Sequence, residues 1–289
     1  MKVISEKKFL YIIMFAIGFI FLFPLLVTFT NSLMTEMEIS LNYSTNLSYF
    51  DIFAGIEENF VDMNLIPNEV TFDQYEETLI NQPSFIILLI NSLKITVPVV
   101  IGNLIISMLT AYGFSMWKWK YKDVVFFVYI IVMLMPLQAV LVPNYIIADM
   151  LNLKDSYLAI ILPGIFYPFG TFLLRQNLKS MPVEYFEAAS IDGAGLFYIF
   201  FHIVIPQMKS GIAALSMLVF IEYWNLVEQA IIFIKDYYRE PLSVYLSRIA
   251  EGSIGIVFAA SCIYMILPLW FLLAGQKNLE KGIELSGIK

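Results

Sequence analysis

The stretch Glu187-Ala188-Ala189-Ser190-Ile191-Asp192-Gly193-Ala194, followed by Ile203-Val204-Ile205-Pro206, is a polar, small-residue segment between strongly apolar regions. Glu187 adds negative charge near the start of an expected helix, which favours the helix N-terminus. Gly193 can adopt the left-handed conformation that ends a helix. The alanines offer so little bulk that another backbone can approach closely. The stretch therefore predicts a short helix, a break and a second helix, together forming a docking surface for another protein.

The composition places this segment in a membrane protein. Mean hydropathy is +0.77, 60% of the residues are hydrophobic and only 14% are charged, whereas soluble chains average about half apolar and about a quarter charged. The apolar residues occur in runs near the length of a membrane helix instead of alternating, which favours helices over barrel strands. A single cysteine, Cys262, and a single histidine, His202, exclude a disulfide framework and a zinc site within one chain.

We expect an all-α fold with six membrane-spanning helices and both termini in the cytosol. The expected spans are residues 9–29, 85–112, 124–142, 158–174, 211–234 and 254–274. With this topology, twelve of the 17 basic residues lie in cytosolic segments, in agreement with the positive-inside rule. Arg175 is expected to open the cytosolic segment that contains the stretch quoted above. The chain divides into a first span with its loop (1–84), a transmembrane core (85–275) and a cytosolic tail (276–289).

The loop after the first span is strongly acidic. Residues 34–84 contain ten Asp or Glu residues and no Lys or Arg, so the net charge of −7 describes one exposed segment and gives no reason to expect nucleic-acid binding. A structureless loop of this length is uncommon, so we expect short helical pieces, one of them starting at residues 71–75. The loop either meets an extracytoplasmic partner or is simply solvated.

The spacing of the quoted stretch resembles a known signature. Glu187, Ala188 and Ala189, then Gly193, Ile203 and Pro206, match the cytoplasmic loop of permease subunits of binding-protein-dependent ABC importers, with Ile205 where Leu is usual. Further matches from about residue 85 to the C-terminus are similar to the carbohydrate branch of that family, of the type of the maltose importer's smaller permease. They include Asn91-Ser92-Leu93, Ala111-Tyr112-Gly113-Phe114 and Trp224-Asn225.

The resemblance implies a type I ABC importer fold in the cytoplasmic membrane. It implies four kinds of partner: a second permease subunit, two cytosolic ATPase subunits, an extracytoplasmic solute-binding protein and the lipid bilayer. This chain would bind no cofactor, and ATP and Mg would sit on the ATPase subunits. The residues expected to couple to the ATPase are Glu187, Ala188, Ala189, Asp192, Gly193, Ala194, Ile205 and Pro206. The loop from Lys235 to Gly252 would reach the binding protein.

A polar cluster lies within the expected fifth span. Its members are Glu222, Trp224, Asn225, Glu228 and Gln229. Polar side chains at membrane depth are costly and face a bundle interior or a water-filled cavity. Glu222, Asn225 and Gln229 recur at helical spacing, so we expect them on one helix face. The cluster either lines the translocation pathway or packs on the second permease subunit. Asn103, Ser107, Gln138 and Asn144 are interpreted as interhelical hydrogen-bond partners.

The leading hypothesis is a non-enzymatic transport subunit that moves a sugar or oligosaccharide, driven by ATP hydrolysis on separate subunits. The alternatives are an ABC importer permease for another small solute and a secondary transporter with Glu222 or Glu228 as proton carrier. The sequence has no G-x-x-x-x-G-K-[ST] phosphate-binding loop and no visible inverted repeat. An intramembrane enzyme is disfavoured because the sequence offers no plausible set of nucleophile, base and metal ligands.

Overall fold

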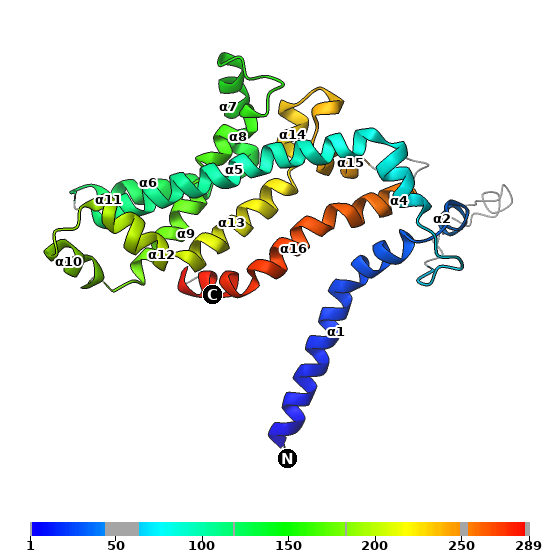
Figure 1. The fold of residues 1–289 in the computed structure, drawn as a ribbon, viewed down its shortest axis with the longest axis horizontal. Coiled ribbons are helices and arrows are strands. Elements are labelled where there is room, and N and C mark those ends of the chain that lie inside the picture. The colour runs from blue at the N-terminus through cyan, green and yellow to red at the C-terminus, as the bar shows by residue number, and fades with distance from the viewer. Residues whose placement is uncertain (1, 44–63, 118, 183, 249–253, 287–289) are drawn as a thin grey trace. The chain divides into compact units, whose positions relative to one another are not determined.

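The computed structural model describes residues 2–43, 64–117, 119–182, 184–248 and 254–286. These residues form helices and loops, with no strand among them (Figure 1), so the predicted all-α fold is confirmed. The chain forms two compact units: Met1–Ile86 with Arg248–Ile266, and Ile87–Ser247 with Leu267–Lys289.

Four helices are long and apolar enough to cross a membrane: Lys8–Asn31, Pro83–Met116, Leu158–Lys179 and Ile254–Lys277. Two further helix pairs pass the same test but are bent, by 97° between Lys122–Met133 and Leu137–Met150, and by 74° between Leu196–Gln207 and Lys209–Trp224. The described residues thus give six spans if each bent pair counts as one. The first bend interrupts the expected third span, whereas the second precedes the expected fifth span, which is interrupted instead where its helix ends at Trp224.

The first unit joins α1 (Lys2–Asn31) to the segment after it. Helix α2 (Glu36–Tyr43) is followed, beyond the undescribed residues 44–63, by α4 (Asp73–Glu76) and the π-helix η1 (Glu77–Asn81). The Ser32 and Tyr75 hydroxyls lie 2.7 Å apart, and the backbone N–H of Thr71 donates to the carbonyl of Leu33 at 2.9 Å. The expected helix start within residues 71–75 is confirmed.

The second unit holds most of α5 (Pro83–Met116) and the helices that pack against it. In chain order these are α6 (Lys122–Met133), α7 (Leu137–Met150), α8 (Leu158–Ile165), α9 (Pro168–Lys179), α10 (Glu184–Ile191), α11 (Leu196–Ile199), the π-helix η2 (Phe200–Val204), α12 (Ile205–Gln207), α13 (Lys209–Trp224), α14 (Glu228–Phe233), the 3-10 helix η3 (Tyr237–Arg239) and α15 (Leu242–Ser247). Within this unit, α10 lies at one end, away from α14 and α15 (Figure 1).

The last helix, α16 (Ile254–Ser286), runs past residue 275 without a break. Most of the expected tail, residues 276–289, is therefore helical, and residues 287–289 lie outside the described part. The boundary at 275 remains a prediction.

The span formed by α8 and α9 is broken at Phe166 and Tyr167. Pro168 has no N–H, so the Gly164 carbonyl lacks the donor that a continuous helix would supply and accepts the Tyr167 N–H at 3.3 Å instead. The Asn103 side-chain amide, from α5, donates to the carbonyls of Gly164 at 3.1 Å, Ile165 at 3.3 Å and Tyr167 at 3.1 Å. Asn103 is fully buried. The predicted role of Asn103 as an interhelical hydrogen-bond partner is confirmed.

Helix α9 approaches α5 very closely at Gly170. A Cβ atom there would lie 2.3 Å from the Ser107 Oγ and 2.5 Å from the Asn103 Oδ1, distances that real contacts do not show. Ser107 also donates to the Asn103 Oδ1 at 3.3 Å. Only glycine at this position allows the buried polar pair on α5 to meet the α9 backbone.

Arg175 lies within a helix and is buried, and its expected place at the start of the cytosolic segment remains a prediction. Helix α9 continues to Lys179, and Arg175 is only 4% exposed. Its guanidinium lies 3.3 Å from the Asp123 carboxylate on α6 and 3.6 Å from the centre of the Phe126 ring. The ion pair and the aromatic face stabilise a charge that the apolar surroundings alone would disfavour.

The bend between α6 and α7 falls at Leu134, Met135 and Pro136. Pro136 is extended, with φ −65° and ψ 146°, and α7 begins directly after it. A proline disfavours helical geometry in the residue before it, so this chemistry explains why the expected third span is interrupted.

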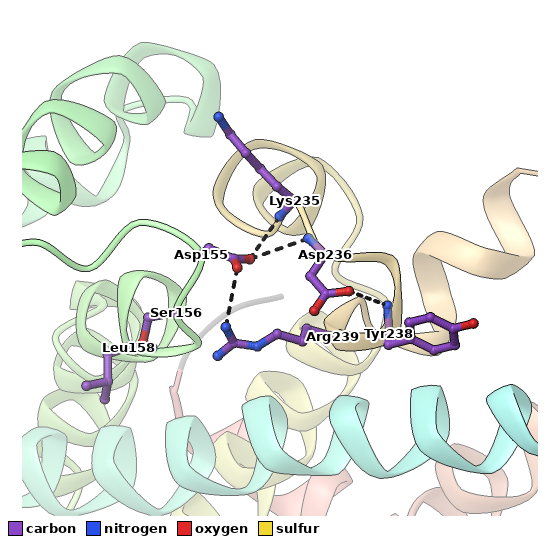
Figure 2. A network of polar contacts seen from close by, with 7 residues as sticks. All are labelled: Asp155, Ser156, Leu158, Lys235, Asp236, Tyr238 and Arg239. Carbon is purple, nitrogen blue, oxygen red and sulfur yellow. Dashed lines mark hydrogen bonds and ion pairs between the residues drawn. The ribbon is translucent and has the colours of Figure 1, made fainter.

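A polar network joins two loops at the end of the second unit that carries α14 and α15. The Asp155 carboxylate accepts the backbone N–H groups of Lys235 at 3.1 Å and Asp236 at 3.5 Å, and contacts the Arg239 guanidinium at 3.3 Å (Figure 2). Asp155 has a φ of 54°, a left-handed geometry that Asp tolerates better than most residues. The pKa of Asp155 is held below its usual range, chiefly by the hydrogen bond from the Lys235 N–H. The hydrogen bond from the Asp236 N–H and the charge of Arg239 lower it further.

Helix α5 binds the same loop. The Asn91 amide donates to the carbonyls of Tyr238 at 2.8 Å and Glu240 at 3.2 Å, and the Ser92 Oγ accepts the N–H of Leu242 at 2.9 Å. The loop is therefore held on two sides by buried or charged partners.

We expect Asp155→Asn to lower the melting temperature at pH 7. A carboxyl with a depressed folded-state pKa stabilises the fold above its ordinary pKa of about 3.9 and loses that effect as the pH falls through the lower folded value. The difference between wild type and variant should therefore shrink by about pH 3. Asp149→Asn is the matched control, because the exposed Asp149–Lys154 pair should contribute little. A difference in melting temperature between wild type and Asp155→Asn that stays the same from pH 7 to about pH 3 would contradict this account.

Candidate functional site

Helix α10 is built as the sequence predicts. Glu184 and Glu187 lie in its first turn, where they favour the helix N-terminus. Phe186 is only 8% exposed and packs in the main hydrophobic core, so one large side chain anchors the helix to the rest of the unit.

The helix ends in a Schellman motif at Gly193. Its φ is +79°, the N–H of Ala194 donates to the carbonyl of Ala189 at 2.9 Å, and the N–H of Gly193 donates to that of Ser190 at 3.1 Å. This pair of hydrogen bonds defines the motif, in which a left-handed glycine satisfies the last helical carbonyls. The predicted break at Gly193 is confirmed.

The outward side of this turn combines charge, small residues and one large apolar side chain. Glu187, Ala188, Asp192 and Gly193 are exposed, and Ile191 is 86% exposed. Ala189 and Ala194 are half-buried against the core. The arrangement is a surface that a partner protein can contact closely.

The second part of the quoted stretch lies at a bend. The π-helix η2 leads into α12, where Ile205 and Pro206 form the first turn, and α13 starts at Lys209. Ile205 is half-buried and Pro206 is exposed. The structure therefore places these two residues not on the α10 surface but at the hinge-like bend that connects the α10 segment to α13.

A hydrogen bond ties this segment to α5. The Tyr112 hydroxyl donates to the carbonyl of Leu196, at the start of α11, at 2.9 Å. Tyr112 also packs on Phe200, with ring centroids 5.1 Å apart. A displacement of α10 thus has two routes into the second unit, through α5 and through the α12–α13 bend.

The polar cluster is arranged differently from the prediction. Helix α13 ends at Trp224, and Val227, with φ −122°, precedes the start of α14 at Glu228. Glu222, Asn225 and Gln229 therefore do not share one helix face, and that prediction is wrong. Asn225 donates both its backbone N–H, at 3.2 Å, and its side-chain amide, at 2.9 Å, to the Ile221 carbonyl, so its side chain bonds the end of its own helix.

The members of the cluster also differ in accessibility. Trp224 is fully buried and stacked on Phe220, so its ring cannot stack on a sugar. Glu222, Asn225 and Glu228 are exposed and Gln229 is half-buried. Glu228 accepts a hydrogen bond from Gln138 at 3.2 Å, which joins α14 to the start of α7 and confirms the interhelical role predicted for Gln138.

The sequence did not predict two ion pairs of the structure, Asp155 with Arg239 and Asp123 with Arg175. Their members are separated by 84 and 52 residues, and no local pattern pairs them. Among the described residues, no group of three or more His, Cys, Asp or Glu side chains could hold a metal ion.

Comparisons with known proteins identify the family. Residues 102–284 match the family model described as "Binding-protein-dependent transport system inner membrane component". The chain is 26% identical over 79% of its length to the arabinooligosaccharides transport system permease protein AraQ of Bacillus subtilis, covering 83% of that protein. It is 29% identical over 67% of its length to the lactose transport system permease protein LacG of Rhizobium radiobacter, covering 72% of it.

A third relative is the sn-glycerol-3-phosphate transport system permease protein UgpE of Yersinia enterocolitica, 29% identical over 70% of this chain and 74% of its own length. The fold is similar to a chain in the crystal structure of a bacterial ABC transporter involved in the import of the acidic polysaccharide alginate. The TM-score is 0.74 with 21% identity, over 96% of both chains. The family model matches more than half of this chain, over residues 102–284, and the chain belongs to the family of inner membrane components of binding-protein-dependent transport systems.

Proposed function

We propose that this chain is the permease subunit of an ATP-driven importer for a sugar or oligosaccharide. The observation that carries the proposal is the α10 turn, an exposed small-residue surface closed by the Gly193 Schellman motif in a member of a transport family. Two of the relatives described above are named for arabinooligosaccharides and lactose, and a third for sn-glycerol-3-phosphate. A carbohydrate or a related polyol phosphate is the cargo class that these names share.

The proposed assembly contains a second permease subunit, two ATPase subunits that carry ATP and Mg, and an extracytoplasmic solute-binding protein. The sequence itself has no phosphate-binding loop, so the energy source must lie on another chain. The most apolar stretch of the candidate span Lys8–Asn31 has no buried residue. That surface is available to lipid or to the second permease.

In this proposal α10 is the coupling helix. Glu187 and Asp192 supply charge, and Ala188, Ala189, Gly193 and Ala194 allow close approach of an ATPase subunit. Closing of the ATPase pair displaces α10. The displacement reaches α5 through the Tyr112–Leu196 hydrogen bond and α13 through the bend at Ile205 and Pro206.

The proposed orientation puts α10 and both termini in the cytosol. The Asp155–Arg239 network then lies on the outer side, where it holds the Lys235–Arg239 segment in a fixed shape (Figure 2). A pre-shaped loop is suited to meeting the solute-binding protein, because less conformational entropy is lost on contact.

Glu187→Lys tests the coupling role. The side chain is exposed, so charge reversal should leave the fold and membrane insertion intact while weakening contact with the ATPase. A tagged wild-type chain should co-purify with an ATPase and a second permease, and vesicles should take up labelled oligosaccharide in a vanadate-sensitive manner. In the variant we expect uptake to fall at least about tenfold, the equivalent of about 1.4 kcal/mol.

Glu184→Lys is the matched control, since Glu184 lies in the same helical turn and is also exposed but lies outside the coupling set. Wild-type uptake by Glu187→Lys would refute the coupling role. Uptake by the purified chain alone, driven by a proton or sodium gradient, would refute the proposed function as a whole.

Glu222 and Asn225 are proposed to face the translocation pathway, because both are exposed at the end of α13. Polar groups at membrane depth are retained where they contact water or substrate. We expect Glu222→Ala and Asn225→Ala to change the relative uptake rates of labelled mono- and oligosaccharides. Ser216→Ala is the control, because its hydroxyl only bonds its own helix, at the Ala213 carbonyl. Unchanged rates and selectivity in both variants, with normal assembly, would show that these residues pack on the second permease instead.

A further inference from the structure

A cation-lined groove of about 690 Å³ lies beside α10. Helices α5, α6, α9 and α10 contribute its walls. Its charged lining residues are Lys122, Arg175, Lys179 and Glu187, three cations against one carboxylate. The Asp123 carboxylate, paired with Arg175, brings the count to three cations and two carboxylates, a small positive balance that favours an anionic ligand.

Arg175 forms part of the wall of this groove. The residue is almost fully buried, with 4% exposed, and its guanidinium contacts Asp123 and the Phe126 ring. The Nε atom is buried and has no hydrogen-bond partner. A buried donor without a partner is uncommon and costly, and a charged one favours an anionic oxygen as its acceptor.

A second groove, of about 570 Å³, adjoins the first at Phe114, which lines both. It is almost entirely apolar. Its lining residues are Leu109, Thr110, Gly113, Phe114, Trp117 and Trp119. Helix α5 ends at Met116, so the tryptophans lie just past the end of a membrane span, where Trp side chains are typical of the lipid headgroup level.

We propose that the two grooves together bind one anionic phospholipid. The phosphate lies against Lys122, Lys179 and Arg175, and an acyl chain lies against Leu109 and the two tryptophans. Basic pockets between membrane helices are known to suit acidic headgroups. A soluble phosphate would use the cationic groove alone, whereas the apolar groove that continues from it at the membrane end of α5 fits a molecule with both parts. This site does not depend on the proposed cargo or on coupling.

The charge part is tested with phosphatidylglycerol as the probe. The detergent-solubilised assembly is mixed with this lipid, and bound lipid is counted by native mass spectrometry. The Lys122→Gln, Lys179→Gln double variant should retain roughly thirtyfold less lipid, the factor expected when two basic residues near a membrane surface are lost. The matched control is Lys120→Gln with Lys209→Gln, which removes two exposed lysines that do not line either groove.

The apolar part is tested with Gly113→Leu. A Cβ at Gly113 meets nothing within 4 Å, so the larger side chain should fill the groove without a clash and should also favour the helix. Gly18→Leu, at an equally open position in α1, is its control. We expect Gly113→Leu to reduce lipid retention and Gly18→Leu to leave it unchanged.

Equal retention in the double variant and its lysine control would overturn the proposal. It would also be overturned if inorganic phosphate displaced the bound lipid while Gly113→Leu had no effect, since the groove would then hold a soluble anion. Retention of phosphatidylcholine as strong as that of phosphatidylglycerol would remove the role of the cations.

Discussion

The hydrogen bonds from Asn103 to the carbonyls of Gly164, Ile165 and Tyr167 join α5 to the break between α8 and α9. Hydrocarbon supplies no water to satisfy a broken helix, so every freed backbone group needs a protein partner. Pro168 removes the helical donor to the Gly164 carbonyl, which accepts the Tyr167 N–H and, from a neighbouring helix, the Asn103 amide. Gly170 makes this possible, because any larger residue would collide with Asn103 and Ser107.

The same helix that carries Asn103 holds the unit at two other levels. Near one end of α5, Asn91 and Ser92 bind the backbone of the loop that contains Arg239. Near the other end, Tyr112 binds the segment after α10. Helix α5 therefore connects the proposed outer loop, the broken span and the proposed coupling helix. In the proposed mechanism, movement of α10 reaches the pathway through α5, because this one helix contacts all three segments.

The local features were predictable from sequence, whereas the distant pairings were not. Apolar runs predict the helices, and Gly193 predicts the end of α10, because both signals lie within a few residues. The end of α13 at Trp224 was missed, since apolar residues continue beyond it and only the Asn225 amide and the Val227 geometry reveal the break. The burial of Arg175 was missed for another reason. Its stabilising partners lie on α6, so the sequence shows only a charged residue after an apolar run.

The stability of the Asn103→Leu variant tests the central claim most directly. Leucine has nearly the same size but no donor, so the carbonyls between α8 and α9 lose their hydrogen bonds from Asn103, at a cost of about 1–3 kcal/mol. Thr110→Val is the control, because its hydroxyl only bonds its own helix, at the Ile106 carbonyl. We predict that the melting temperature of the solubilised protein falls by several degrees in Asn103→Leu, with little change in Thr110→Val. Equal melting temperatures for the two variants would contradict the claim that Asn103 secures the broken span.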